Sequence, residues 1–67
     1  MDIRERVAKN LCTLRTEREL SKSKFAEMSG ISRRQYTSYE NGDVLPSLDV
    51  LERIARAHNV TTSWLVR

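Results

Sequence analysis

The sequence predicts an all-α fold of five short helices joined by tight turns. Apolar residues recur at the helical spacing of three or four positions along most of the 67 residues. Residues that favour helix N-termini precede these apolar stripes. No segment shows the alternation of apolar and polar residues that is typical of a strand. Since repeats, low-complexity tracts and flexible linkers are also lacking, residues 1–67 are expected to form one domain.

The first helix is expected at residues 3–18. Asp2 and Glu5 have the spacing of a capping box at its start. One apolar stripe runs along the helix and would face the core. This stripe consists of Ile3, Val7, Leu11 and Leu14.

The next two helices lie on either side of Gly30. Ser21 can cap the first of them, and Gly30 can end it because glycine adopts a left-handed backbone without steric cost. Ala26 is small enough for two helices to cross closely. Ser32 and Gln35 repeat the capping-box spacing and define where the following helix starts. The side chains expected to pack inward are Phe25, Ala26 and Met28 on the first helix, and Tyr36 and Tyr39 on the second.

A loop at residues 41–46 is expected to precede the fourth helix. Its first three residues, NGD, have turn chemistry, and Pro46 cannot lie in a helix interior. Ser47 restarts the helical pattern, and Asn59 can take the left-handed conformation at the end of this helix. The apolar face of the helix consists of Leu48, Leu51, Ile54 and Ala55.

The last expected helix is short. Thr61 or Thr62 can cap it, and it contains Trp64 and Leu65. Trp64 can close the core or contribute to contact between two copies of the chain, because a large aromatic residue near the chain end suits both roles.

Charge, cysteine content and hydropathy narrow the range of functions. The net charge of +3, with 31% charged residues, favours a polyanionic partner without requiring one. Cys12 has no second cysteine to pair with, which favours a reducing cytoplasm, and we expect it to be partly buried. His58 has no partner ligand, so we expect it to pack or to lie on the surface. No apolar run approaches a membrane span of about 20 residues, and the start of the chain does not resemble a signal peptide.

Residues 21–42 carry the main indication of function. Two helices about a glycine turn describe a helix-turn-helix. The outward face of the second helix offers hydrogen-bond donors and acceptors at about the width of a DNA major groove. This face consists of Arg33, Arg34, Thr37 and Ser38. Sequence-specific binding of double-stranded DNA is therefore the leading hypothesis.

An ordered set of short motifs extends over nearly the whole chain. The motifs are Leu14-Arg15, Leu20-Ser21, Phe25-Ala26-Glu27, Gly30-Ile31-Ser32, Tyr39-Glu40-Asn41-Gly42, Pro46-Ser47-Leu48, Ile54-Ala55, and Val60 followed by Trp64-Leu65. This set resembles the helix-turn-helix family of phage repressors and Cro proteins, which includes xenobiotic-response-element-type bacterial regulators. The resemblance implies a compact five-helix repressor/Cro-like DNA-binding domain with its helix-turn-helix at helices 2 and 3. It also implies a transcriptional regulator, most simply a repressor, that binds a palindromic operator as a homodimer.

The resemblance places the second helix of the motif in the major groove. The base contacts would then come from Arg33, Arg34, Thr37 and Ser38. We favour Arg34 as the first base-reading residue, because a guanidinium matches the O6 and N7 acceptors of guanine. The alternative is that both arginines contact only phosphate or solvent. The expected phosphate contacts are Ser21, Lys22, Ser23, Asn41, Gly42 and Arg15.

Four residues depart from the family pattern. Lys22 replaces the usual glutamine, so it keeps a phosphate contact but loses an amide that often buttresses the recognition helix. Asp43 stands where many relatives have a basic residue, which suggests that its loop tilts away from DNA. Glu19 replaces a helix-ending glycine, with a strain of about 1 kcal/mol if its backbone is left-handed. Tyr36 replaces an aliphatic residue, so its hydroxyl needs water, a phosphate or a buried partner.

The resemblance also implies an ion pair and a dimer surface. Arg15 and Glu40 would tie the first helix to the end of the third, although they can also be two unrelated surface charges. The dimer contact would be weak until DNA is bound. Its expected residues are Leu45, Val60, Trp64 and Leu65. No cofactor, metal ion, small-molecule ligand or membrane partner is expected.

Three other functions fit the sequence less well than a regulator. An adaptor or antitoxin-like module would keep the fold without reading DNA, but it gives little reason for the pair Arg33-Arg34. RNA binding is a weaker option, because side chains cannot readily read the deep major groove of A-form RNA. An enzyme is least expected, since the sequence shows no nucleophile with a base, no ligand cluster and no phosphate-binding glycine loop.

Overall fold

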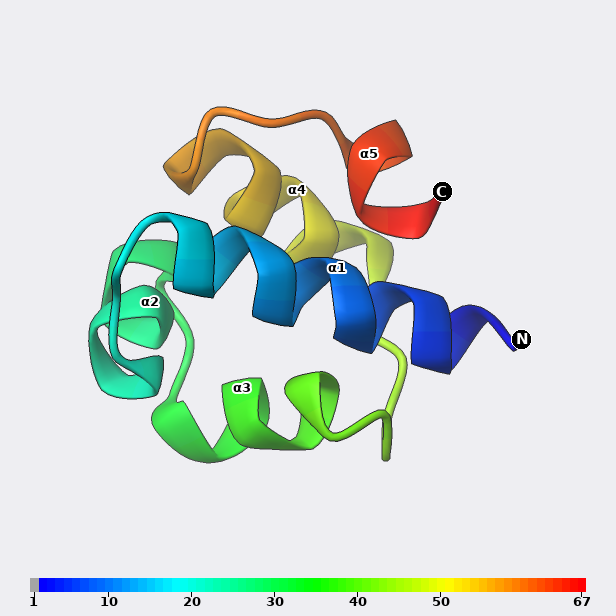
Figure 1. Ribbon diagram of the computed structural model, residues 1–67, viewed down its shortest axis with the longest axis horizontal. Coiled ribbons are helices and arrows are strands. Elements are labelled where there is room, and N and C mark those ends of the chain that lie inside the picture. Colours follow the sequence, from blue (N-terminus) through cyan, green and yellow to red (C-terminus); the bar gives the residue numbers. More distant parts are fainter. Residues whose placement is uncertain (1) are drawn as a thin grey trace.

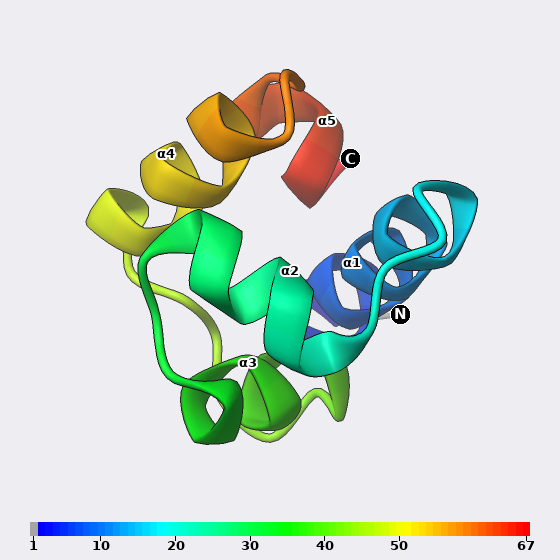
Figure 2. The same ribbon diagram turned by 90° about the vertical axis from the view of Figure 1, so that its left-hand side faces the viewer.

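Five α-helices and their connections account for residues 2–67, the part of the chain that the computed structural model describes. The helices are α1 (Ile3–Glu17), α2 (Lys22–Ser29), α3 (Arg33–Glu40), α4 (Leu48–Ala57) and α5 (Thr62–Val66). No strand is present among these residues, so the predicted all-α fold is confirmed. In Figure 1, α1 crosses the middle of the molecule, with α3 on one side of it and α4 and α5 on the other. Figure 2 shows α2 between α3 and α4, and α2 packs against both.

Side-chain caps start all five helices. The caps are Asp2, Ser21, Ser32, Ser47 and Thr61, each accepting a hydrogen bond from a backbone N–H two or three residues later. At α3 the predicted capping box is complete. Ser32 Oγ accepts from Gln35 N at 3.0 Å, and Gln35 Oε1 accepts from Ser32 N at 3.0 Å. This reciprocal pair fixes the first residue of α3 and therefore its rotational phase.

Left-handed residues end the first four helices. They are Glu19, Gly30, Gly42 and Asn59, with φ of 55°, 72°, 77° and 57°. In each case the next residue donates its N–H to the carbonyl five residues earlier, as in Schellman motifs. These bonds join Leu20 to Arg15, Ile31 to Ala26, Asp43 to Ser38, and Val60 to Ala55, at 3.0 to 3.1 Å. The left-handed conformation predicted at Asn59 is therefore confirmed, and the condition for strain at Glu19 is met. Helix α1 ends one residue earlier than expected.

The core lies where the predicted apolar stripes of the helices meet. It consists of Val7, Leu11, Leu14, Phe25, Ala26, Tyr36, Tyr39, Leu51, Ile54, Ala55 and Leu65. Three expectations were wrong. Met28 is 46% exposed because α2 faces its neighbours through Phe25, Ala26 and Ser29. Leu48 is 68% exposed because it lies in the first turn of α4, at the edge of the apolar stripe. Cys12 is exposed because it points from the side of α1 opposite the core.

A buried histidine joins α2 to the end of α4. His58 is 1% exposed, and its ring stacks on Phe25 with centroids 3.8 Å apart and an interplanar angle of 7°. Ser29 Oγ donates to the Phe25 carbonyl at 2.8 Å and lies 2.8 Å from His58 Nε2. Because that hydroxyl proton is already used, the bond requires the ring proton on Nε2. His58 Nδ1 is buried without a hydrogen-bond partner, so this is a packing residue.

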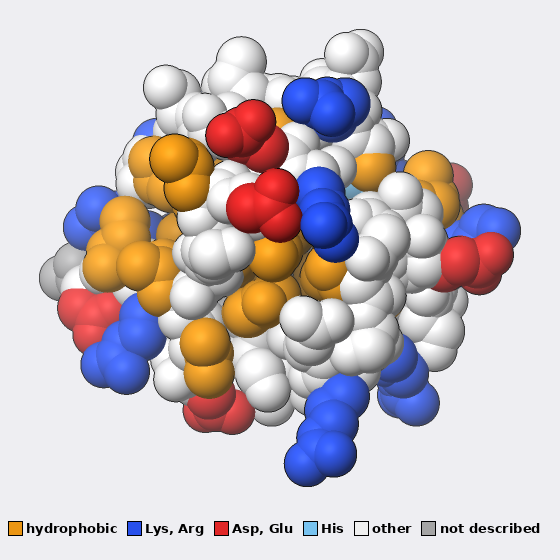
Figure 3. All heavy atoms as spheres, turned by 180° about the vertical axis from the view of Figure 1, so that it is seen from behind, with side chains coloured by type: hydrophobic (Ala, Val, Ile, Leu, Met, Phe, Trp, Pro, Cys, Tyr) orange, Lys and Arg blue, Asp and Glu red, His pale blue; other side chains and the backbone are white. Residues whose placement is uncertain are grey.

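The last helix is held by α1. Asn10 Nδ2 donates to the Leu65 carbonyl at 2.9 Å, and Leu65 itself is completely buried. Among the described residues, four large apolar side chains stay exposed: Met28, Val44, Leu45 and Leu48. Figure 3 shows one face of the molecule, on which apolar side chains are interspersed with charged and polar ones.

Candidate functional site

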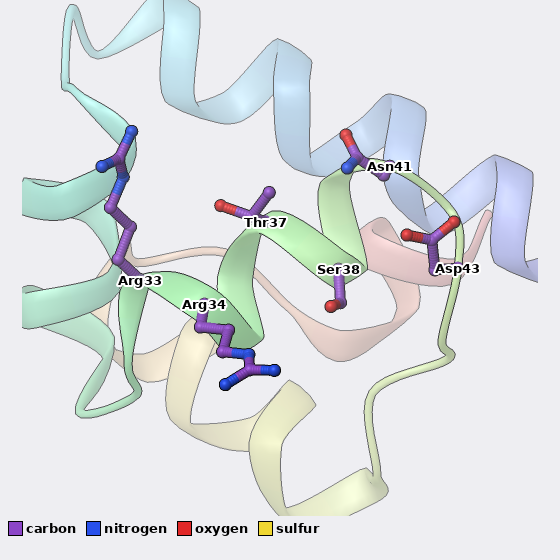
Figure 4. A pocket seen from close by; sticks show the side chains of 6 residues that line it. All are labelled: Arg33, Arg34, Thr37, Ser38, Asn41 and Asp43. Atoms are coloured by element: carbon purple, nitrogen blue, oxygen red, sulfur yellow. The ribbon is translucent and has the colours of Figure 1, made fainter.

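The outward side of α3 lines an open groove of about 610 Å³, which we call the α3 groove. Its lining residues are Arg33, Arg34, Thr37, Ser38, Asn41 and Asp43. Figure 4 shows Arg33 and Arg34 at the start of α3, Asn41 and Asp43 at its end, and Thr37 and Ser38 between them. The groove therefore brings together all four predicted base contacts and one predicted phosphate contact, Asn41.

The phase of α3 explains this arrangement. Tyr36 and Tyr39 are buried at a spacing of three residues, with exposures of 0% and 8%. Two inward side chains at this spacing set the helix face that packs, and the remaining positions then point outward. Thr37 and Ser38 are consequently half-buried at the base of the groove, while Arg33 and Arg34 are exposed.

The two groove arginines form no ion pair among the described residues. Both guanidinium groups therefore keep all of their donors available for a partner outside the protein. Because they lie in the first turn of a short helix, their backbone is held by the capping box of Ser32 and Gln35.

The far end of α3 is held by four side chains that we call the Glu40 cluster: Arg15, Lys22, Tyr36 and Glu40. Arg15 Nε donates to Glu40 Oε1 at 2.8 Å, which confirms the predicted ion pair. Tyr36 Oη donates to the same oxygen at 2.8 Å, so its hydroxyl has a buried partner. Lys22 Nζ lies 3.5 Å from Glu40 Oε2. One carboxylate thus joins α1, α2 and α3.

Burial and hydrogen bonding set the protonation states in this cluster. Burial disfavours the ionised form of Glu40, but the hydrogen bonds from Arg15 and Tyr36 and the charges of Arg15 and Lys22 outweigh it and lower its pKa. Burial raises the pKa of Tyr36, and the bond to Glu40 raises it further. The pair is therefore a neutral phenol donating to a carboxylate, which suits a permanent structural contact.

Lys22 corrects a sequence expectation. Replacing the usual glutamine was expected to remove the bridge between the two motif helices, but Lys22 bridges to Glu40 through its charge. The Lys22 side chain is 35% exposed, so it also faces solvent at the start of α2. Opposite charges at these two positions were the available signal, but they are 18 residues apart and only the fold brings them together.

Asp43 also lies on the α3 groove. Its charge suggested that its loop tilts away from DNA, and the structure places it on the same groove as the arginines. The left-handed Gly42 and the bond from Asp43 N to Ser38 O turn the chain back against α3. The acidic residue is therefore part of the site.

The other predicted phosphate contacts lie outside the groove lining. They are Ser21, Lys22 and Ser23 at the start of α2, Gly42 after α3, and Arg15 on α1. Arg15 also donates from Nη1 to the Leu20 carbonyl at 3.0 Å and is only 18% exposed. Its internal role is therefore better supported than a phosphate contact.

The predicted dimer residues differ in exposure. Leu45 is 41% exposed, and Val60 and Trp64 are half-buried. Leu65 is completely buried in the core, so its inclusion was wrong. Trp64 also has the Arg67 guanidinium over its ring, with Cζ 4.8 Å from the centroid.

Within residues 2–67, no group of three His, Cys, Asp or Glu side chains is arranged to hold a metal ion. None of the helices in this range is long and apolar enough to cross a membrane.

A helix-turn-helix family model matches residues 13–65. The cryptic phage CTXphi transcriptional repressor RstR of Vibrio cholerae is 34% identical over 53 residues, which cover 79% of this chain and 48% of RstR. The antitoxin PezA of Streptococcus pneumoniae serotype 4 is 34% identical over 55 residues, which cover 82% of this chain and 35% of PezA. The chain thus spans less than half the length of either curated relative.

Two solved structures share the fold. The hypothetical transcription factor NHTF from Neisseria superposes with a TM-score of 0.93 at 24% identity, covering 98% of this chain and 76% of that one. The clp gene regulator ClgR from C. glutamicum gives a TM-score of 0.86 at 20% identity, covering 97% and 84%.

Proposed function

Because this chain belongs to the Cro/C1-type helix-turn-helix family, we propose that it is a sequence-specific DNA-binding transcriptional regulator that places α3 in the major groove. The observation that carries the proposal is the pair Arg33 and Arg34, exposed and without an ion pair among residues 2–67, on a helix that the Glu40 cluster holds in place. Free guanidinium groups on a fixed helix suit recognition of base edges.

Base contacts would come from the α3 groove. Arg34 is the first choice for guanine, whose O6 and N7 accept two N–H groups in one plane. Thr37 can offer a methyl group to thymine or a hydroxyl to several bases, and Ser38 can donate or accept. A well-placed arginine–guanine pair contributes about 1 to 3 kcal/mol of discrimination against a wrong base.

Phosphate contacts would orient the domain. Ser21 Oγ caps α2, and the N–H groups that follow it can attract a phosphate oxygen through the helix dipole. Lys22 would add a charge there, and Ser23, Asn41 and Gly42 allow close approach of the backbone. Arg15 is retained as a weaker candidate, because its guanidinium donates to Glu40 and Leu20 and still has N–H groups to spare.

The regulator is proposed to act as a repressor in a bacterial or phage-infected cytoplasm, binding a palindromic operator as a homodimer. Two copies would place their α3 helices in successive major grooves about 34 Å apart. Leu45, Val60 and Trp64 are the proposed contact residues, since Leu65 is buried. Occupancy of the operator is sufficient for repression, so no catalytic group or cofactor is required.

The proposal is tested by selecting bound sequences from random DNA, then titrating the best site with salt. A palindromic consensus is expected, with log K falling against log salt by about 0.9 per phosphate contact. Recovery of random sequences alone would overturn sequence-specific binding. A consensus without two-fold symmetry would overturn the homodimer on a palindrome but leave DNA reading intact.

The similarity to PezA favours one second candidate, an antitoxin-like module that binds a protein partner. In that case the groove arginines would not be needed for base discrimination. Replacing both Arg33 and Arg34 with alanine would then leave any DNA discrimination unchanged, and the first proposal predicts its loss.

A further inference from the structure

The α3 groove is charged oppositely at its two ends. Arg33 and Arg34 stand at the start of α3, and Asp43 stands beyond its end (Figure 4). The Asp43 side chain is exposed and takes part in none of the ion pairs or side-chain hydrogen bonds formed among residues 2–67. The groove therefore presents free donors at one end and a free acceptor at the other.

Backbone hydrogen bonds hold the turn that carries Asp43 against the end of α3. Asp43 N donates to Ser38 O at 3.0 Å, and Gly42 N donates to Tyr39 O at 3.1 Å, which are the two bonds of a Schellman motif. Gly42, with φ of 77°, packs on α1, because a Cβ there would lie 3.8 Å from Ala8 Cβ. This turn is part of the packed structure, so the backbone at Asp43 is held relative to α3 and its carboxylate stays at this end of the groove.

A carboxylate at this position disfavours general attraction to DNA. Facing a phosphate, it would be repelled. Facing base edges in the major groove, it can accept a hydrogen bond from an amino group. Adenine also offers an amino group, N6–H₂, but the neighbouring N7 acceptor would repel the carboxylate. Cytosine offers N4–H₂ with no neighbouring acceptor, so cytosine is the base that an unpaired carboxylate fits best.

We propose that Asp43 is a specificity-determining residue that accepts a hydrogen bond from a cytosine amino group at the end of each half-site. This inference rests on the proposed function, since it requires α3 to lie in the major groove. With a helix rise of about 1.5 Å per residue and base pairs about 3.4 Å apart, the cytosine lies roughly three to four base pairs from the base that Arg34 reads. At a site without this cytosine, the Asp43 carboxylate would have no amino group to bind and would be repelled by the DNA. This repulsion would increase the preference for the correct half-site.

The test is selection from random DNA with three forms of the full chain: the wild type, Asp43→Asn, and Glu52→Gln as a control. Glu52 is exposed on α4 outside the groove, so its variant changes the net charge equally. The wild type and the Glu52 variant should select one cytosine that Asp43→Asn no longer requires. In Asp43→Asn, the preference for cytosine over other bases at that position should fall by about 5- to 100-fold. Adenine can then replace cytosine, because the asparagine amide pairs with adenine N6 and N7.

The outcomes separate the two proposals. If the wild type selects a consensus and Asp43→Asn selects the same one with uniformly higher affinity, Asp43 only repels phosphate and the inference is overturned while DNA reading stands. If the wild type selects no consensus, the proposed function fails, and the role of Asp43 fails with it. If Asp43→Asn unfolds at the same melting temperature as the wild type, any change in selectivity arises at the contact with DNA and not from the fold.

Discussion

Arg15 Nε donates a 2.8 Å hydrogen bond to Glu40 Oε1, which ties the middle of the molecule to the last residue of α3. The Glu40 side chain is only 8% exposed, so water cannot replace its partners easily. Lys22 brings α2 to the same carboxylate. The two helices of the motif and α1 are therefore aligned through one side chain, and the α3 groove depends on it.

Glu40→Gln should destabilise the fold and weaken DNA binding. The amide would keep an acceptor but lose the charge that satisfies Arg15 and Lys22, so we expect unfolding to become easier by about 1.5 to 3 kcal/mol. Denaturant unfolding monitored by Trp64 fluorescence measures this. Glu27→Gln is the matched control, because its contact with Lys24 is 4.0 Å long and exposed. Equal stability of the two variants would contradict a structural role for Glu40.

Glu19→Gly should stabilise the protein. Glu19 has φ of 55°, a conformation that strains an L side chain by about 1 kcal/mol and that glycine adopts freely. In a domain of this size the melting temperature should rise by roughly 4 to 8 °C. Scanning calorimetry compares this variant with Glu17→Gly, in which glycine replaces a helical residue and should lower the melting temperature. A decrease for Glu19→Gly would contradict the strain argument.

His58 should make stability depend on pH just below neutrality. Burial lowers the pKa of His58 below its ordinary value of 6.5, a nearby phenylalanine carbonyl opposes this shift, and the charge of Arg18 adds to it. The unfolded chain thus binds a proton at a pH where the folded chain does not, so stability is complete above pH 6.5 and falls as the pH drops through the folded-state pKa.

Chemical unfolding between pH 5 and 7.5 tests this, with His58→Phe as the comparison. Phenylalanine keeps the ring stacked on Phe25 but cannot titrate. Its variant should lose the pH dependence in this range, whereas Glu40 contributes only at lower pH because its pKa lies below 4.5. If the unfolding free energy of both proteins changes equally with pH in this range, the pH dependence arises from other groups.

Local signals in the sequence predicted the helices well, and contacts between distant residues were harder to predict. The cap at Ser32 and the left-handed Gly30 act within five residues, so the sequence contains all the information they need. Whether Lys22 reaches Glu40, or Ser29 reaches His58, depends on how the helices cross. Residues of these types at such sequence separations are usually not in contact, so the sequence alone does not predict these pairs.

In the candidate site, too, local features were predictable and features set by the fold were not. The outward phase of Arg33, Arg34, Thr37 and Ser38 follows from buried tyrosines on the same helix, so the groove lining was largely predictable. The place of Asp43 in the groove was not predicted, because charge alone was considered, while the turn at Gly42 determines where its backbone lies. Leu65 was misjudged because an apolar residue near the chain end can serve a core or an interface equally well.

In the proposed function, α3 reads DNA through its two exposed arginines. The most direct measurement is the affinity of Arg33→Ala/Arg34→Ala for the selected site and for a scrambled site at one salt concentration. Lys9→Ala/Arg56→Ala, which removes two exposed cations outside the groove, is the control. The groove variant should lose about 10- to 100-fold of its preference for the selected site, while the control should keep it. An unchanged preference in the groove variant would contradict base reading by α3 through these arginines.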